Sequence, residues 1–476
     1  MLLQHSALYI LARGLPGLVS FLAITIYTRL LDPGDYGYYA LVIAAVGLLQ
    51  SVLFRWLELS LLRFLPAHIE RPQVIMSVIV MSFLGMISFT SVLALIMFFF
   101  LSEPSHRSLL SLAVVLLWAE SWYNLNLELL RSQLRPLSYG LMSGLKAVLA
   151  LVMGSVLILQ GLGAYGPLIG LLAGTLMSAL LIAGREWKGV QLGRINKQIF
   201  IDLLQYGLPL AVTFALTFIV SSSDRFLIAW FLGAESAGLY APGYDLAFHS
   251  IGMLMAIVNL AAYPLVIRSM EQQGEEAARQ QFRKNSLLLL AVAVPASIGF
   301  AICAPNISNV MLGEGYRETA LFLFPWIALA ALISGVKSFI LDLAFQLGYN
   351  TIGQLKVVLV AASVNVILNI WWIPIFGLIG AAYATVISYS VGFILSLVFG
   401  RRAFRLPALP LESIKIIIAS GIMALVLWLT LGYRGWVALL GQIFLGSGVY
   451  VVVLLVLNLA GSRERLLRFL LKTEMT

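Results

Sequence analysis

The sequence predicts an all-α integral membrane protein with about fourteen transmembrane helices. Its 476 residues are 61% hydrophobic and only 11% charged, with a mean hydropathy of +0.98. Soluble globular chains are about half apolar and about a quarter charged. Apolar runs of about 20 residues, the length of a membrane-spanning helix, recur along the whole chain. These runs lack the alternation of barrel strands, so we expect each span to be a helix.

The apolar runs give the spans in chain order and leave only short loops between them. The first run is too long for a cleavable signal peptide, lacks a basic start and leads into further spans. The longest loops, about 185–202 and 267–283, are too short for a soluble domain. The predicted spans are roughly 7–31, 37–62, 74–101, 108–131, 138–160, 163–184, 203–232, 237–266, 284–311, 318–346, 351–373, 376–399, 413–432 and 436–460.

The net charge of +9 follows from the topology and does not require a nucleic-acid partner. With a cytoplasmic amino terminus, most basic residues at the ends of the spans fall on the cytoplasmic side. Only Arg107, Arg317 and Arg434 then lie in outer loops. This is the positive-inside pattern of membrane proteins. We therefore expect both termini in the cytoplasm.

The chain repeats itself with the same order of motifs in its two halves. Small-residue matches are individually weak, but four in order indicate a duplication. Gly14-Leu15-Pro16 matches Gly207-Leu208-Pro209, and LKAVL at 145–149 matches LKVVL at 355–359. The remaining matches pair Gly37, Tyr39 and Ala40 with Gly238, Tyr240 and Ala241, and Gly170, Thr175 and Ser178 with Gly380, Thr385 and Ser388.

One repeat comprises six spans, and an even number inserts both copies with the same orientation. The two lobes are then related by a pseudo-two-fold axis along the membrane normal, as in some transporters. The predicted organisation is an amino-terminal lobe at 1–187, a cytoplasmic linker at 188–202, a carboxy-terminal lobe at 203–400, two additional helices within 413–460 and a basic cytoplasmic tail at 461–476.

No catalytic or cofactor motif is present in the sequence. Gly335-Val336-Lys337-Ser338 lacks the earlier glycine of a phosphate-binding loop and lies within a span. Cys/His spacing typical of a metal site is absent. Asp32 and Asp35 would suit a polytopic glycosyltransferase, but Asp-Pro-Gly-Asp favours a turn. We therefore expect no enzyme activity, no cofactor and no metal.

Three groups of residues resemble a known family over nearly the whole chain. They are RLLDPGDYGYYA at 29–40, Asp224-Arg225 followed by Gly238-Leu239-Tyr240, and Asn365 and Asn369 leading into IPIFGLIGAA at 373–382. The pattern resembles the bacterial polysaccharide or O-antigen flippases (Wzx type) of the multidrug/oligosaccharidyl-lipid/polysaccharide exporter superfamily. Related lipid II flippases carry an Arg-Asp pair in the first helix, where this chain has Ala23 and Ile24.

The resemblance implies an alternating-access carrier in the bacterial cytoplasmic (inner) membrane. Its substrate would be an undecaprenyl-diphosphate-linked oligosaccharide, moved from the cytoplasmic to the outer leaflet for polysaccharide or O-antigen biosynthesis. H⁺ and Na⁺ are the candidate coupling ions, and a polysaccharide polymerase and chain-length proteins are candidate partners. The alternative is a cation-coupled multidrug antiporter, whose cavity is expected to present acids to cationic drugs.

A diphosphate headgroup needs cations within the bundle, and charged residues inside membranes usually face a cavity or a partner. The candidate substrate ligands are Arg13, Arg55, Arg225 and Lys337. Glu58 lies three residues after Arg55 on the same helix face. An ion pair between Arg55 and Glu58 is therefore an equal alternative to a phosphate site at Arg55. Asp224 points about 100° away from Arg225 on a helix. Either Arg225 binds phosphate and Asp224 holds it in position, or the two residues form ion pairs that fix this helix to its neighbours.

Two further groups of residues are candidates for coupling and for motion. Asp245 and His249 lie four residues apart and are either a proton-coupling pair or a structural pair. Gly14, Pro16, Gly207 and Pro209 are either hinges or static kinks, since proline removes a backbone donor and bends a helix. Lys146 either extends to the membrane surface or faces a cavity.

Overall fold

The structure is a computed structural model that describes residues 2–68, 72–184, 186–190 and 196–461, the side chains of 2–13, 15 and 460 excepted. Within these ranges the chain is helical and contains no strand, which confirms the predicted all-α class. Twelve helices are long and apolar enough to span a membrane. Two shorter apolar helices, Pro16–Leu30 and Ser413–Trp428, bring the total in these ranges to fourteen (12 + 2), in agreement with the predicted count.

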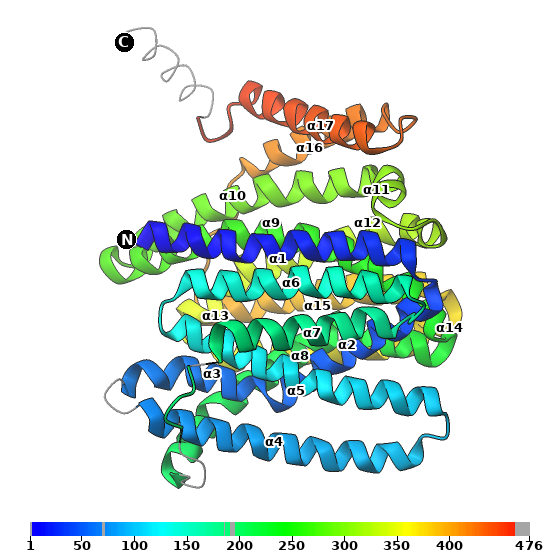
Figure 1. The fold of residues 1–476 in the computed structure, drawn as a ribbon. Helices are drawn as coiled ribbons and strands as arrows, with labels where there is room; N and C mark the ends of the chain where they lie inside the picture. The colour runs from blue at the N-terminus through cyan, green and yellow to red at the C-terminus, as the bar shows by residue number, and fades with distance from the viewer. Residues whose placement is uncertain (1, 69–71, 185, 191–195, 462–476) are drawn as a thin grey trace, which may run out of the picture. The chain divides into compact units, whose positions relative to one another are not determined.

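The chain divides into two compact units, Met1–Gly238 and Leu239–Thr476. The first unit holds the first eight α-helices and the start of the ninth (Figure 1). The lobe boundaries predicted at 187 and 203 remain a prediction. The helices of this unit are α1 (Leu2–Leu30), α2 (Pro33–Leu53), α3 (Arg55–Phe64), α4 (Pro72–Phe100), α5 (Pro104–Ser132), α6 (Pro136–Leu159), α7 (Tyr165–Ala183) and α8 (Lys197–Leu232), with a short 3₁₀ helix at Leu65–His68.

The second unit contains most of α9 and the remaining helices. The two additional helices α16 and α17 pack against each other, and α16 lies along α10 (Figure 1). The elements are α9 (Ala234–Gln273), α10 (Glu275–Ile302), α11 (Ala304–Met311), α12 (Glu314–Val336), the π-helix η2 (Lys337–Leu341), α13 (Leu343–Leu347), α14 (Thr351–Phe376), α15 (Leu378–Ala403), α16 (Ser413–Trp428), α17 (Trp436–Val456) and a 3₁₀ turn at Leu459–Gly461.

The Asp-Pro-Gly-Asp segment is the start of α2. The side chain of Asp32 accepts a hydrogen bond from the backbone N–H of Asp35 at 2.9 Å, and Pro33 occupies the first turn. Both features are typical of a helix amino terminus. Asp32 therefore has a structural role as the helix cap.

The internal repeat is visible in matching helix contacts of the two units. A Cβ at Gly170 of α7 would overlap the backbone of Gly154 in α6, and one at Gly380 of α15 would overlap the carbonyl of Trp372 in α14. Small residues let membrane helices approach this closely. The same local bond follows in both places, because Ser178 Oγ donates to Thr175 O and Ser388 Oγ to Thr385 O.

A second repeat-matched pair of glycines meets at one crossing. A Cβ at Gly37 of α2 would overlap the carbonyl oxygen of Ala234, and one at Gly238 would overlap that of Pro33. All four residues belong to the first unit. The glycines of the two copies of this motif thus allow the amino-terminal turns of α2 and α9 to cross at backbone distance.

Three predicted spans are interrupted, and for the spans at 37–62 and 284–311 the sequence-based boundaries are wrong. The span at 37–62 divides at Phe54 between α2 and α3, and the span at 284–311 divides at Cys303 between α10 and α11. The span at 318–346 contains the π-helix Lys337–Leu341. Charged or polar residues lie close to each break (Arg55, Asn306 and Lys337), but each predicted span as a whole is apolar enough to conceal it.

Candidate functional site

The break at Phe54 places a polar cluster at the junction of α2 and α3. Arg55 Nη1 lies 2.6 Å from Glu58 Oε2, and Gln50 Nε2 donates to the other carboxylate oxygen of Glu58 at 2.5 Å. The guanidinium of Arg55 also lies over the ring of Phe214 in α8, 4.9 Å from its centre. The predicted internal ion pair of Arg55 and Glu58 therefore exists, and Gln50 and Phe214 are members that the sequence did not reveal.

Arg55 is partly exposed although its acidic partner is buried. The side chain of Glu58 is 1% exposed, whereas that of Arg55 is 27% exposed. An arginine carries five N–H donors. Glu58 takes only one of them among the interactions of the described residues. The remaining donors suit a planar, bidentate contact with a phosphate group.

Lys337 lies in a buried ion pair of the second unit. Its Nζ is 2.7 Å from Asp342 Oδ2, and Ser396 Oγ of α15 donates to Asp342 Oδ1 at 2.7 Å. The side chains of Lys337 and Asp342 are 8% and 4% exposed. The neutralised lysine is thus less accessible to an anionic substrate than Arg55 is.

The π-helix explains why Lys337 and Asp342 meet. Residues five apart on an α-helix point about 140° away from each other. In η2 the N–H of Asp342 instead bonds to the carbonyl of Lys337 at 2.8 Å, which is the spacing of a π-turn. Single π-turns inside helices are often found at functional sites. Here the turn stacks the acid over the base and makes the pair possible.

A cavity of about 290 Å³, lined by apolar and polar residues, lies within the first unit between α1, α2, α5, α6 and α7. Lys146 lines it, with its Nζ 2.7 Å from Glu120 Oε2 and 4.2 Å from the ring centre of Tyr123. Thr175 Oγ1 donates to the second carboxylate oxygen of Glu120 at 2.7 Å. Lys146 therefore faces a cavity, which Pro16 of α1 also lines. An oligosaccharide needs more space than this cavity has.

Asp224 and Arg225 are both buried in α8, with 0% and 7% of their surface exposed. Asp224 Oδ1 accepts the backbone N–H of Arg225 at 2.9 Å. Burial of both groups is what a lock between helices requires, since buried charges need partners. The role of Arg225 as a second phosphate ligand remains a prediction.

Asp245 and His249 lie together on α9. His249 Nε2 is 3.5 Å from Asp245 Oδ1, and the histidine side chain is 64% exposed. The geometry matches the predicted pairing at four residues' spacing. A role in proton coupling stays a prediction, as do the hinge roles of Gly14, Pro16, Gly207 and Pro209. The side chain of Arg13 lies outside the described residues.

The matched glycines of the two Gly-Leu-Pro motifs differ in their surroundings. A Cβ at Gly207 would overlap the carbonyl oxygen of Trp56 and Ser60 Oγ, because α8 packs closely on α3. Among the described residues, nothing lies within 4 Å of a Cβ built at Gly14. Close packing of α8 on α3 therefore explains why position 207 is a glycine, without any need for flexibility.

Gly207→Ala is expected to lower the free energy of unfolding by about 1–3 kcal/mol, because the added methyl overpacks a helix contact. Gly14→Ala is expected to be neutral or stabilising by up to about 1 kcal/mol, because alanine favours helix. Thermal unfolding of the two purified variants measures the difference. Equal destabilisation by both substitutions would contradict this assignment of Gly207.

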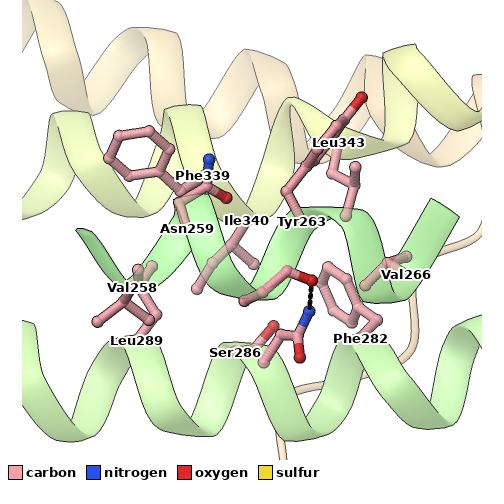
Figure 2. Close-up of a pocket in the computed structure, with 12 residues that line it drawn as sticks. Val258, Asn259, Tyr263, Val266, Phe282, Ser286, Leu289, Phe339, Ile340 and Leu343 are labelled. Atoms are coloured by element: carbon pink, nitrogen blue, oxygen red, sulfur yellow. Dashed lines mark hydrogen bonds between the residues drawn. The ribbon is translucent and has the colours of Figure 1, made fainter. Parts of the chain in front are cut away.

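A much smaller cavity of about 20 Å³ lies between α9, α10 and the segment from η2 to α13 (Figure 2). Asn285 Nδ2 donates to Ala262 O at 2.6 Å beside it, which joins α10 to α9. A volume of this size holds about one water molecule. It is too small for a sugar.

Among the residues that the structure describes, no group of three or more His, Cys, Asp or Glu side chains is placed to hold a metal ion.

Comparison with known proteins places these features in a family. A family profile described as "Polysaccharide biosynthesis protein" matches residues 26–321. The chain is 24% identical over 207 residues to the uncharacterized membrane protein MJ1068 of Methanocaldococcus jannaschii and 23% identical over 268 residues to the probable flippase AglR of Haloferax volcanii. These matches cover 43% and 52% of this chain, and the chain spans only 40% and 52% of those relatives.

Solved structures show the same fold at low sequence identity. Lipid II flippase MurJ in an inward closed conformation matches with a TM-score of 0.79 at 15% identity, over 95% of this chain and 99% of that one. An inward-facing MATE family transporter of the MOP superfamily gives 0.60 at 17%, over 84% and 98%. A MOP superfamily transporter from Pyrococcus furiosus gives 0.57 at 15%, over 85% and 95%.

The profile match at 26–321 covers more than half of the 476 residues, and the fold agrees with it. The chain is a multi-pass membrane protein with the fold of the MOP superfamily, and it belongs to the family of polysaccharide biosynthesis proteins.

Proposed function

We propose that this protein is a flippase that moves an undecaprenyl-diphosphate-linked oligosaccharide from the cytoplasmic to the outer leaflet of a bacterial cytoplasmic membrane by alternating access. The membership in the polysaccharide biosynthesis family carries the proposal. The relative named as a probable flippase and the fold of a lipid II flippase support the same activity.

The chemistry of the described residues fits this substrate. A diphosphate headgroup is negative and strongly hydrated, and therefore needs cations within the bundle to cross the hydrocarbon layer. Arg55 has N–H donors that Glu58 does not take, and the buried carboxylate of Glu58 holds the guanidinium in place. Ala23, at the position where lipid II flippases carry a charged pair, lines the first-unit cavity. This favours a lipid-linked glycan other than lipid II.

A multidrug antiporter is the second candidate, because MATE transporters share the fold. Such a protein is expected to offer an unneutralised acid to a cationic drug. Two acids of the first unit, the buried Glu58 and the partly buried Glu120, are instead each engaged by a basic side chain. This pairing favours the flippase.

Deletion of the gene in its native host separates the two functions. The flippase account expects an undecaprenyl-diphosphate-linked oligosaccharide to accumulate on the cytoplasmic side and surface polysaccharide to be lost, both restored by the wild-type gene. Unchanged surface polysaccharide together with increased sensitivity to cationic drugs would favour the antiporter.

A further inference from the structure

A groove of about 640 Å³ opens on the second unit beside α10. One wall is a single face of α10, and the other comes from Pro410 and Glu412 before α16 and Leu459 after α17. Lys415 Nζ of α16 donates to Asn458 O at 3.3 Å, which ties the start of α16 to the end of α17 next to the groove. The groove is therefore built from three elements that are held together.

The α10 face changes from polar to apolar along its length. The lining residues recur at three- and four-residue spacing, which is one stripe of an α-helix. In chain order they are Gln280, Arg283, Lys284, Leu287, Leu288 and Ala291. Arg283 and Lys284 are exposed, and Leu288 is 53% exposed one turn further on. The stripe thus presents cations at one end and hydrocarbon at the other.

The groove also lies where apolar helices begin and end. The apolar part of α10 starts at Leu287, α16 begins at Ser413, and α17 ends at Val456. Each of these helices is apolar enough to lie in the bilayer. Their polar ends meet at the groove, which places it at the boundary between headgroups and hydrocarbon.

We propose that this groove binds an anionic glycerophospholipid of the surrounding bilayer, with its phosphate on Arg283 and Lys284 and one acyl chain along Leu287, Leu288 and Ala291. Neither cation forms an ion pair with any of the described residues. The one acid in the lining, Glu412, leaves it a net positive charge (two cations, one acid). None of the lining residues is a candidate substrate ligand, so the site stands or falls independently of the flippase function.

Charge complementarity distinguishes this lipid from the chain's own carboxy-terminal segment. The sequence after Gly461 carries Arg463, Arg465, Arg468 and Lys472 against Glu464 and Glu474. A basic segment is repelled by Arg283 and Lys284, whereas an anionic headgroup is attracted. The polar-to-apolar stripe likewise matches a headgroup followed by an acyl chain.

Native mass spectrometry of the full-length protein in detergent tests the site, with phosphatidylglycerol and phosphatidylcholine as probes. The wild type is expected to retain phosphatidylglycerol in preference to phosphatidylcholine. Arg283→Ala/Lys284→Ala is expected to lower the phosphatidylglycerol affinity about 30-fold, since each basic residue near an anionic headgroup contributes about fivefold. Leu288→Asn is expected to weaken the binding of both lipids, because it removes apolar contact with the acyl chain.

Arg401→Ala/Arg402→Ala is the matched control, because it removes an adjacent exposed basic pair at the end of α15. It is expected to leave phosphatidylglycerol binding unchanged, and a chain ending at Gly461 is expected to bind like the wild type. An equal loss in both double variants would overturn the site, as would a gain of bound lipid on truncation. Tighter binding of undecaprenyl phosphate at the same site would overturn the assignment to a bilayer phospholipid.

Discussion

Asp342→Ala is expected to lower the free energy of unfolding by about 3–5 kcal/mol, because it leaves the ammonium of Lys337 buried without its counter-charge. The structure offers no solvent route for relief, since both side chains are almost fully buried. The second partner of the carboxylate, Ser396, loses its acceptor in the same variant. Chemical unfolding of the purified protein in detergent measures the change.

The double variant Lys337→Met/Asp342→Asn distinguishes a structural pair from a substrate ligand. It removes both charges and keeps a side chain that can accept from Ser396. We expect it to recover most of the lost stability, because replacing a buried ion pair as a whole is often nearly neutral. Stability of Asp342→Ala within about 1 kcal/mol of the wild type would contradict the buried pair. Normal folding of the double variant with loss of transport would assign Lys337 to the substrate.

Arg55→Ala/Glu58→Gln is expected to reduce transport at least about tenfold while the protein stays folded. A hydrogen bond to a charged group is worth about 1.5–3 kcal/mol, which corresponds to a factor of ten or more. Arg55→Ala alone leaves Glu58 buried without its cation and confounds folding with function. The added Glu58→Gln removes that charge and can still bond to Gln50, so transport is measured on a stable protein.

Glu58→Gln alone is the matched control, and it is expected to fold and to transport, because Arg55 is then released for phosphate. Arg55→Lys is expected to retain partial transport, since lysine supplies the charge without the planar bidentate fork. Wild-type transport by the double variant would remove Arg55 from the substrate path. Loss of transport in Glu58→Gln alone would instead show that the pair acts as a unit.

The sequence predicts the class, the number of spans and the repeat, because these depend on hydrophobicity and on small residues that helix packing requires. Gly170 and Gly380 illustrate the point, since both occur where two helices approach at backbone distance. Polar residues also join these helices, because Asn365 Nδ2 of α14 donates to Ser388 Oγ of α15 at 3.2 Å.

The partners of the charged residues were harder to predict. Glu58 and Arg55 share a helix face at three residues' spacing, so their pairing follows from the sequence. Lys337 and Asp342 point apart on an α-helix, and only the π-turn between them brings them together. Lys146 and Glu120 lie on different helices, and single-sequence reasoning does not determine which residues of two helices meet.

Reconstitution into liposomes tests the central claim most directly. Vesicles containing the purified protein and an undecaprenyl-diphosphate-linked oligosaccharide are mixed with a lectin that cannot cross the membrane, and the glycan it binds is followed in time. Transport is expected to expose inner-leaflet glycan to the lectin in wild-type vesicles, and much more slowly with Arg55→Ala/Glu58→Gln. Exposure no faster than in protein-free vesicles, in preparations that do move a cationic dye, would contradict the flippase account.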